Sequence, residues 1–317
     1  MALVLAGGAG SLRAQARAKE PEGALFLLVP VGARAVGLGQ AMAAGEGGTE
    51  SVWWNPAGLA RQPKREAAIH HSQTIIGTGD ALAVAVPSAL LGTLALSASI
   101  LDYGDQAVTN REELRIGTLF LRSFVFGATY ATSVGERINA GLTYKLLQFR
   151  VDCSGTCPPT AVLTATASAV DAGVQYTLRP ELPLDVGAAV RNLGPRLQVN
   201  DRDQSDPLPR RLYLGARYEV TAVSRELRGT ALQVVAEVVD DFRAQRPSPR
   251  VGAEFAFQKR ARVRGGYVFD ESGTGAGPAV GLGLSTGGLV IDLARVFEGF
   301  STDAGQPPTY LSLRYLF

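Results

Sequence analysis

The chain has 317 residues, of which 46% are hydrophobic and 19% are charged, and its formal net charge is +2. This balance lacks the basic excess of a nucleic-acid-binding protein, so we expect no nucleic-acid partner. The 37 glycines follow no collagen-like period and accompany only two cysteines. Glycine at this level, with thinly spread apolar residues, favours many β-strands joined by tight turns.

The N-terminus resembles an export signal whose front is missing. Residues 2–8 form a short apolar stretch, and Ala14-Gln15-Ala16 has the A-x-A pattern of a cleavage site. No basic residue precedes the stretch. We therefore interpret residues 1–16 as a truncated signal peptide, with a disordered tail as the alternative.

Residues 32–59 are rich in glycine and contain both tryptophans of the chain. Gly32, Gly37 and Gly39 allow close backbone packing or a positive φ. Pro56 fixes its own φ and biases Asn55 away from the helical region. The Asn55-Pro56 pair therefore favours a turn in which the Asn side chain bonds nearby backbone.

From residue 66 onward, short runs of alternating polarity repeat to the end of the chain. We predict about fourteen strands, an even number that single-chain outer-membrane barrels use. They lie near residues 66–74, 80–87, 92–102, 122–132, 137–149, 165–178, 184–192, 210–220, 230–240, 249–258, 261–270, 278–286, 288–297 and 309–317. The predicted fold class is all-β, a transmembrane antiparallel β-barrel over residues 66–317.

Faces, connections and aromatic residues support this interpretation. Leu142 and Tyr144 alternate with Thr143 and Lys145, so one face of that strand suits lipid and the other needs water or a partner. Short and long connections alternate; residues 103–121 and 150–163 are predicted to be surface loops, and residues 221–229 a turn. Aromatic residues, among them Phe149, gather at strand ends, as in the girdles of membrane interfaces.

The last strand ends on an aromatic residue. Leu313, Tyr315 and Phe317 fall on one face, because successive side chains of a strand point to opposite sides. This ending resembles the C-terminal recognition signal that outer-membrane barrels present to their insertion machinery. We therefore expect these three residues to act as an assembly signal.

The two cysteines, Cys153 and Cys157, are expected to form a small disulfide in a surface loop, because the predicted compartment is oxidising. A metal site would need more ligands, and no histidine is nearby. Adjacent His70 and His71 point to opposite faces, and a catalytic histidine would need a nucleophile and an orienting carboxylate around it. No G-x-S-x-G motif appears, and Ser72 faces away from His71, so an outer-membrane hydrolase is the weak alternative. We expect no enzymatic activity, no metal and no cofactor.

Charges on the inner faces of the strands are predicted to form a network inside the barrel that solvates and braces it; a selective channel is the alternative. These residues are Lys145, Arg191, Arg217, Glu219, Glu237, Glu254, Arg262, Arg264, Asp292 and Arg314.

Residues 32–59 resemble the opening of the PorV/PorQ family, relatives of the FadL-type channels. Family members share a G-A-R-A-x-G-M-G-like run, a stretch of small residues and then W-N-P-A-G-L; Leu38 stands here where Met is usual, and residues 45–50 replace a more acidic run. The resemblance implies that residues 17–65 fold into the lumen as a plug or hatch. Its motif residues are Gly32, Arg34, Gly37, Gly39, Trp54, Asn55, Pro56, Ala57 and Gly58.

The resemblance implies a non-enzymatic barrel in the bacterial outer membrane that serves protein secretion or attachment at the cell surface, as in type IX secretion. Its expected partners are outer-membrane lipid, the barrel-assembly machinery and, in that role, secretion-system proteins and secreted cargo. The alternative is a FadL-like channel for the uptake of hydrophobic small molecules. A docking protein needs a plugged barrel and exposed loops, whereas a channel needs an apolar path.

Overall fold

The computed structural model describes residues 21–158, 162–178, 183–198, 205–242, 247–258, 260–269, 277–297 and 307–317. The predicted signal peptide, residues 1–16, lies outside the described residues. Among the described residues, no helix is both long enough and apolar enough to cross a membrane.

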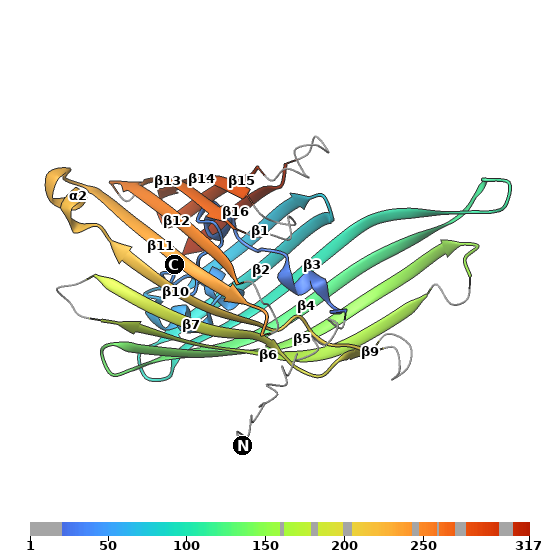
Figure 1. Cartoon of the computed structure of the whole chain (residues 1–317), viewed down its shortest axis with the longest axis horizontal. Coiled ribbons are helices and arrows are strands. Elements are labelled where there is room, and N and C mark those ends of the chain that lie inside the picture. Colours follow the sequence, from blue (N-terminus) through green and yellow to red (C-terminus); the bar gives the residue numbers. More distant parts are fainter. Residues whose placement is uncertain are drawn as a thin grey trace, which may run out of the picture.

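Fourteen antiparallel strands close into one barrel, in which the last strand pairs with the first (Figure 1). The strands are β1 (Glu66–Thr74), β2 (Gly77–Ser88), β3 (Gly92–Thr109), β4 (Arg115–Val134), β5 (Ile138–Gly155), β6 (Leu163–Thr177), β7 (Leu184–Leu193), β10 (Arg211–Glu219), β11 (Thr230–Asp240), β12 (Ser248–Phe257), β13 (Ala261–Val268), β14 (Gly277–Thr286), β15 (Leu289–Val296) and β16 (Thr309–Leu316). A separate two-stranded sheet, β8 (Leu197–Gln198) with β9 (Ser205–Asp206), lies in the connection from β7 to β10. The predicted fold class is confirmed.

The two faces of the barrel wall differ in polarity. Apolar side chains on the outer face are exposed, such as Leu82 at 50%, Leu96 at 68% and Leu282 at 56%. On the inner face, polar side chains such as Lys145 and Arg264 are buried. A closed barrel satisfies its backbone internally, and an apolar outer surface is stable only against lipid. The expected localisation in the bacterial outer membrane is confirmed.

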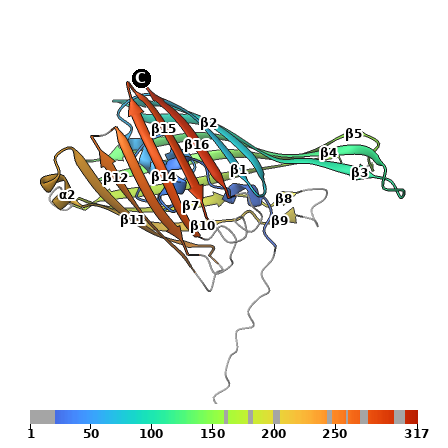
Figure 2. The same cartoon turned by 90° about the horizontal axis from the view of Figure 1, so that it is seen from above.

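Strands β3, β4 and β5 are 18, 20 and 18 residues long, about twice the 9–11 residues that a transmembrane strand needs. Their far ends project well beyond the other strands (Figures 1 and 2). The predicted surface loop at residues 103–121 is therefore wrong for most of its length, and the predicted loop at residues 150–163 is wrong for residues 150–155. Outside lipid, a hydrogen-bonded antiparallel ladder continues without the apolar alternation that marks a membrane strand.

The turns from β2 to β3, from β4 to β5 and from β14 to β15 lie at one end of the barrel, which we call the turn end; the opposite end is the loop end. In outer-membrane barrels the short turns face the periplasm. The predicted turn at residues 221–229 instead contains the helix α2 (Thr221–Glu226). Phe149 is not part of an outer girdle, because it follows Lys145 and Leu147 on the inner face of β5, where its ring packs edge-on against Tyr103 with centroids 6.4 Å apart.

The N-terminal residues form four short helices: η1 (Leu25–Leu28), α1 (Ala33–Gly37), η2 (Thr49–Val52) and η3 (Pro56–Arg61). Residues 32–59 are almost all buried, and the helices contact the inner faces of strands on several sides of the barrel. Five separate apolar clusters join this part of the chain to the wall. We call residues 21–62 the inner segment.

Candidate functional site

The inner segment runs through the barrel from the loop end to the turn end, and strand β10 contacts it at both ends. Arg211, the first residue of β10, forms two hydrogen bonds with the Glu22 carboxylate, at 3.0 and 2.8 Å. Arg217, six residues further along, donates to Glu46 Oε1 at 2.6 Å. The segment therefore spans the interior along the length of this strand.

The predicted glycines lie where the segment needs tight geometry. Gly32 and Gly39 have φ values of 97° and 62°, which disfavour residues with a Cβ. Gly37 in α1 lies against Gly281 of β14; a Cβ added to Gly37 would stand 3.1 Å from the Gly281 Cα. The segment backbone therefore packs directly on the backbone of the wall.

Asn55 joins three parts of the structure with one side chain. Its Oδ1 accepts a hydrogen bond from the Ala57 N–H at 3.1 Å, which caps η3. Its Nδ2 donates to Ala43 O at 2.5 Å and also to the carbonyls of Val174 and Ala188, at 3.4 and 3.3 Å. The predicted bond from Asn55 to nearby backbone is present, and the side chain also fixes the segment to β6 and β7.

The other motif residues surround this cap. Pro56 is the first residue of η3, where a missing N–H costs nothing. Ala57 is fully buried, and Gly58 lies against the Ser51 side chain. Trp54 Nε1 donates to Val31 O at 2.9 Å, and its ring stacks under the guanidinium of Arg191, 5.5 Å from the ring centroid. These contacts hold the two halves of the segment together.

Two carboxylates of the wall bind backbone N–H groups of the segment. Glu237 Oε2 accepts from Met42 N and Ala43 N at 2.9 and 2.6 Å. Glu66 Oε1 accepts from the backbone N–H and the hydroxyl of Thr49 at 2.9 and 2.6 Å. The sequence analysis placed Glu237 in the lumenal network but did not predict its partners, and it did not include Glu66. Both residues lie at inward positions of their strands, and this alternation could have identified them.

Several of the remaining inner charges form two compact networks in the wall. Arg264 binds Glu254 and also Asp292, the latter at 2.7 Å, and Arg314 binds Asp292 at 2.8 Å. On the other side of the barrel, Lys145 binds Asp171 at 2.8 Å. Paired opposite charges brace the strands, whereas single buried charges would be costly.

Glu50 differs from these carboxylates, because both of its oxygens are buried without a hydrogen-bond partner. It lies in η2 and packs against Gly32. Burial raises the pKa of Glu50, and the nearby Asp292 also raises it, while Arg314 and Arg34 oppose the shift. The carboxyl is therefore held toward its neutral form.

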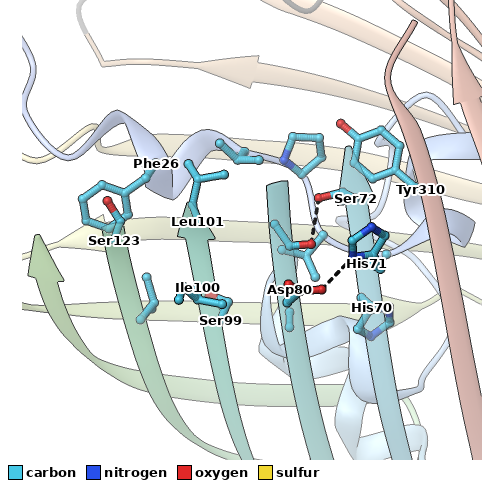
Figure 3. Close-up of a pocket in the computed structure, with 17 residues that line it drawn as sticks. Phe26, His70, His71, Ser72, Asp80, Ser99, Ile100, Leu101, Ser123 and Tyr310 are labelled. Atoms are coloured by element: carbon cyan, nitrogen blue, oxygen red, sulfur yellow. Dashed lines mark hydrogen bonds and ion pairs between the residues drawn. The ribbon is translucent and has the colours of Figure 1, made fainter. Parts of the chain in front are cut away.

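A pocket of about 40 Å³ lies between the inner segment and the inner faces of β1–β4 (Figure 3). A single water needs roughly 10–15 Å³, so the pocket holds more than one water-sized group. Its surface is largely apolar and includes Phe26, Leu101 and Val125, together with polar side chains such as Ser99. The hydrogen-bonded pair His71 and Asp80, at 2.7 Å, also lines it (Figure 3). A mostly apolar cavity with a few polar groups is typical of small-molecule sites.

A second cavity, of about 370 Å³, opens at the turn end. Its lining is rich in charge, and it includes five arginines and two glutamates: Arg34, Arg61, Arg217, Arg262, Arg314, Glu46 and Glu66. Arg61 and Arg217 also hold Asp185 behind the lining, at 2.9 Å for the Arg61 pair. Arg34 binds Glu46 Oε2 at 3.0 Å and approaches Glu254 at 3.9 Å.

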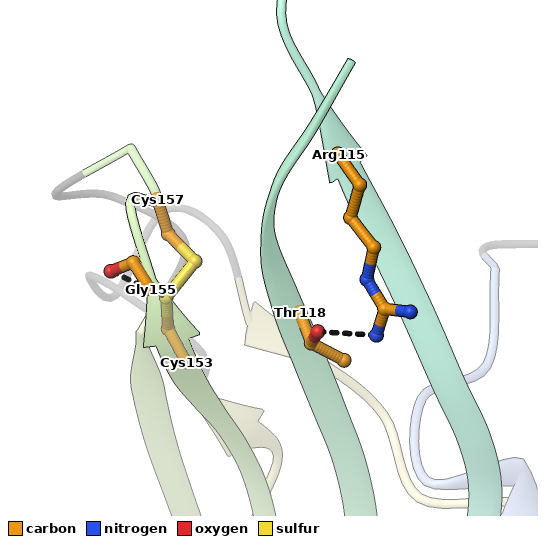
Figure 4. Close-up of a disulfide and its surroundings, with 5 residues drawn as sticks. All are labelled: Arg115, Thr118, Cys153, Gly155 and Cys157. Atoms are coloured by element: carbon orange, nitrogen blue, oxygen red, sulfur yellow. Dashed lines mark hydrogen bonds between the residues drawn. A yellow bond between two sulfur atoms is a disulfide. The ribbon is translucent and has the colours of Figure 1, made fainter. Parts of the chain in front are cut away.

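The other predicted site residues lie outside the lumen. Cys153 and Cys157 are joined by a disulfide at the far end of β5, near Thr118 of β4 (Figure 4). Leu313, Tyr315 and Phe317 are exposed on the outer face, and the rings of Tyr315 and Phe317 stack at 5.9 Å. Their role as an assembly signal stays a prediction. Among the described residues, no group of three or more His, Cys, Asp or Glu is placed to hold a metal ion.

No family model matches this sequence, and no curated protein matches it. Solved structures do match the fold. The Ralstonia pickettii toluene transporter TbuX has a TM-score of 0.58 at 12% identity, over 90% of this chain and 98% of the other. A Pseudomonas aeruginosa FadL homologue has 0.57 at 11%, over 91% and 99%. The CymD monoaromatic hydrocarbon channel has 0.58 at 15%, over 92% and 98%. The chain therefore has the fold of the FadL-type fourteen-stranded outer-membrane barrels.

Proposed function

We propose that this protein is an outer-membrane channel for small hydrophobic molecules, in which the inner segment acts as the hatch. The observation that carries the proposal is the largely apolar pocket between the segment and strands β1–β4. It lies inside the barrel, where an apolar molecule leaving lipid or the cell surface is shielded from water. The names of the matched structures, toluene transporter and monoaromatic hydrocarbon channel, support toluene-like compounds as the first ligands to test.

The test is to fill the pocket from a small residue of the wall. Ser99 lines the pocket from β3, whereas the neighbouring Ala98 points to the outer face. Ser99→Phe should reduce toluene uptake by cells or proteoliposomes about tenfold or more, because the ring occupies the ligand space. Ala98→Phe adds the same ring on the lipid side of the same strand and should leave uptake unchanged.

Both variants must first migrate as folded barrels in unheated gels, because overpacking destabilises some cores. With folding equal, normal uptake by Ser99→Phe would contradict the proposal. Equal loss in both variants would show an effect on the wall and not on a ligand site.

The PorV/PorQ-type role in secretion or attachment remains the second candidate. The observation that favours it is the long extension of β3–β5 beyond the barrel, which offers a surface for a docked protein (Figure 2). Removal of the part of this extension beyond the barrel should abolish docking and leave hydrophobic uptake intact, so the same two assays separate the candidates.

A further inference from the structure

The charge of the turn-end cavity is not used by the proposed channel function. Five of the charged side chains that line it are arginines, against two glutamates. Most of the arginines bind carboxylates of the wall or the segment. Arg262 is the exception: it donates to Ser285 Oγ at 2.5 Å, and its approach to Glu254 Oε1 is only 3.9 Å. Its guanidinium therefore retains donor capacity at the cavity.

A second arginine of the lining, which binds Asp292 through Nη2, has one nitrogen without a partner. Arg314 is 8% exposed, and its Nε has no hydrogen-bond acceptor. A buried guanidinium nitrogen without an acceptor is costly unless an anion or water supplies one. Arginine forks match the planar, bidentate geometry of carboxylate and phosphate oxygens.

Glu46 shows how an anion sits in this cavity. Its carboxylate bridges Arg34 Nη2 at 3.0 Å and Arg217 Nη1 at 2.6 Å, yet its side chain is 50% exposed. Burial alone would raise the pKa of Glu46, but Arg34 and Arg217 lower it below its ordinary value. It stands between Gly45 and Gly47, so the backbone that carries it has few steric restraints.

We propose that the turn-end cavity is a binding site for a small oxyanion, a carboxylate or a phosphate, and that Glu46 is its built-in occupant. An external anion that displaces Glu46 gains Arg34 and Arg217 as partners and lies beside the donors of Arg262. The proposal does not depend on whether any molecule crosses the barrel.

The experiment measures anion binding by calorimetry, on the full-length protein in detergent at constant ionic strength. Inorganic phosphate and acetate are titrated separately, so that the two sources of oxyanion are distinguished. Glu46→Gln removes the competing carboxylate and should tighten binding of the preferred anion about tenfold, the effect of one charge-assisted contact. Arg262→Gln should weaken it about tenfold, and Arg262→Lys, which keeps the charge, should weaken it less.

The matched controls are Glu226→Gln and Arg225→Gln in α2. They make the same changes of charge on another part of the turn end, and they should bind like the parent. Saturable binding of phosphate alone assigns a phosphate site, and saturable binding of acetate alone assigns a carboxylate site. The proposal is overturned if neither anion saturates Glu46→Gln, if Glu46→Gln binds no tighter than the parent, or if Arg225→Gln weakens binding as much as Arg262→Gln.

Discussion

At the scale of single residues, the interior of this barrel is organised by carboxylates with opposite tasks. Glu237 and Glu66 accept backbone N–H groups of the inner segment, and Glu46 bridges two arginines. Glu50 has none of these partners. The first three hold the segment in place through these contacts, whereas ionisation of Glu50 would leave a buried charge without a hydrogen-bond partner and would oppose packing.

Glu50 therefore predicts a pH dependence with a definite sign. The pKa of Glu50 is raised when the segment is packed, so the packed state binds this proton more tightly than the unpacked state does. Packing is therefore weakened as the pH rises from the ordinary pKa of 4.5 through the raised pKa. Each pH unit inside this window costs up to about 1.4 kcal/mol. Hydrogen exchange of residues 33–61, corrected for intrinsic rates, should show less protection as pH rises through this window.

Glu50→Gln should flatten this dependence and increase protection at neutral pH, because the amide never ionises. Arg34 and Arg217 lower the pKa of Glu46, so its contribution is lost only as pH falls below the ordinary value of 4.5. Glu226→Gln in α2 serves as the control with the same charge change. A parent and a Glu50→Gln variant with identical pH profiles would rule out this role of Glu50.

At the scale of elements, the strands were predictable and the contacts of the segment were not. Strand β11 occupies residues 230–240 as predicted, because lipid on one side and polar groups on the other enforce strict alternation. Strand β3 continues past its predicted end at residue 102. The prediction stopped there because Asp102 and Asp105 stand where a lipid-facing strand would carry apolar residues. Beyond the bilayer that alternation is not required.

In the candidate site too, local interactions were predictable from the sequence and long-range contacts were not. The bond from Asn55 to Ala57 follows from local turn chemistry and was predictable. Its bonds to Val174 and Ala188 connect residues more than 100 positions apart. They form because Gly173 has no Cβ there; an added Cβ would overlap the Asn55 side chain. Such a long-range contact cannot be predicted from any single position in the sequence.

Removal of the segment should open the barrel. We expect a variant lacking residues 32–59 to form a barrel still, because its strands hydrogen-bond to one another and closure leaves no edge. In a planar bilayer this variant should conduct ions, whereas the parent should be silent, because we expect the segment, most of whose residues are buried, to block the lumen. A parent that conducts steadily would show that the segment does not close the lumen.

At the scale of the whole molecule, closure depends on the seam between β1 and β16. The register pairs Glu66 with Leu316, and the Phe317 N–H donates to Arg65 O at 2.9 Å. Phe317 is 53% exposed at the turn end, where its ring faces the membrane interface. The terminal residue therefore adds little packing to the barrel itself.

Phe317→Lys separates a thermodynamic role from a recognition role. Lysine at the interface costs only about 0–1 kcal/mol, so packing alone predicts a mild effect. If the ending is the signal read by the assembly machinery, the amount of assembled barrel in the outer membrane should fall severely, as shown by heat-modifiable migration on gels. Phe257→Lys changes another exposed aromatic at the turn end and should assemble normally. Normal levels of both variants would exclude the signal.

The path of the inner segment also fixes an order of events. The segment is synthesised before any barrel strand, and it ends up encircled by all fourteen, with Glu22 held at one mouth and Glu46 and Arg61 at the other. A closed ring of hydrogen-bonded strands has no gap through which a folded segment can pass sideways. We therefore expect the sheet to curl around the segment while the β1–β16 seam is still open. Zipping of that seam is then the step that makes the encirclement permanent.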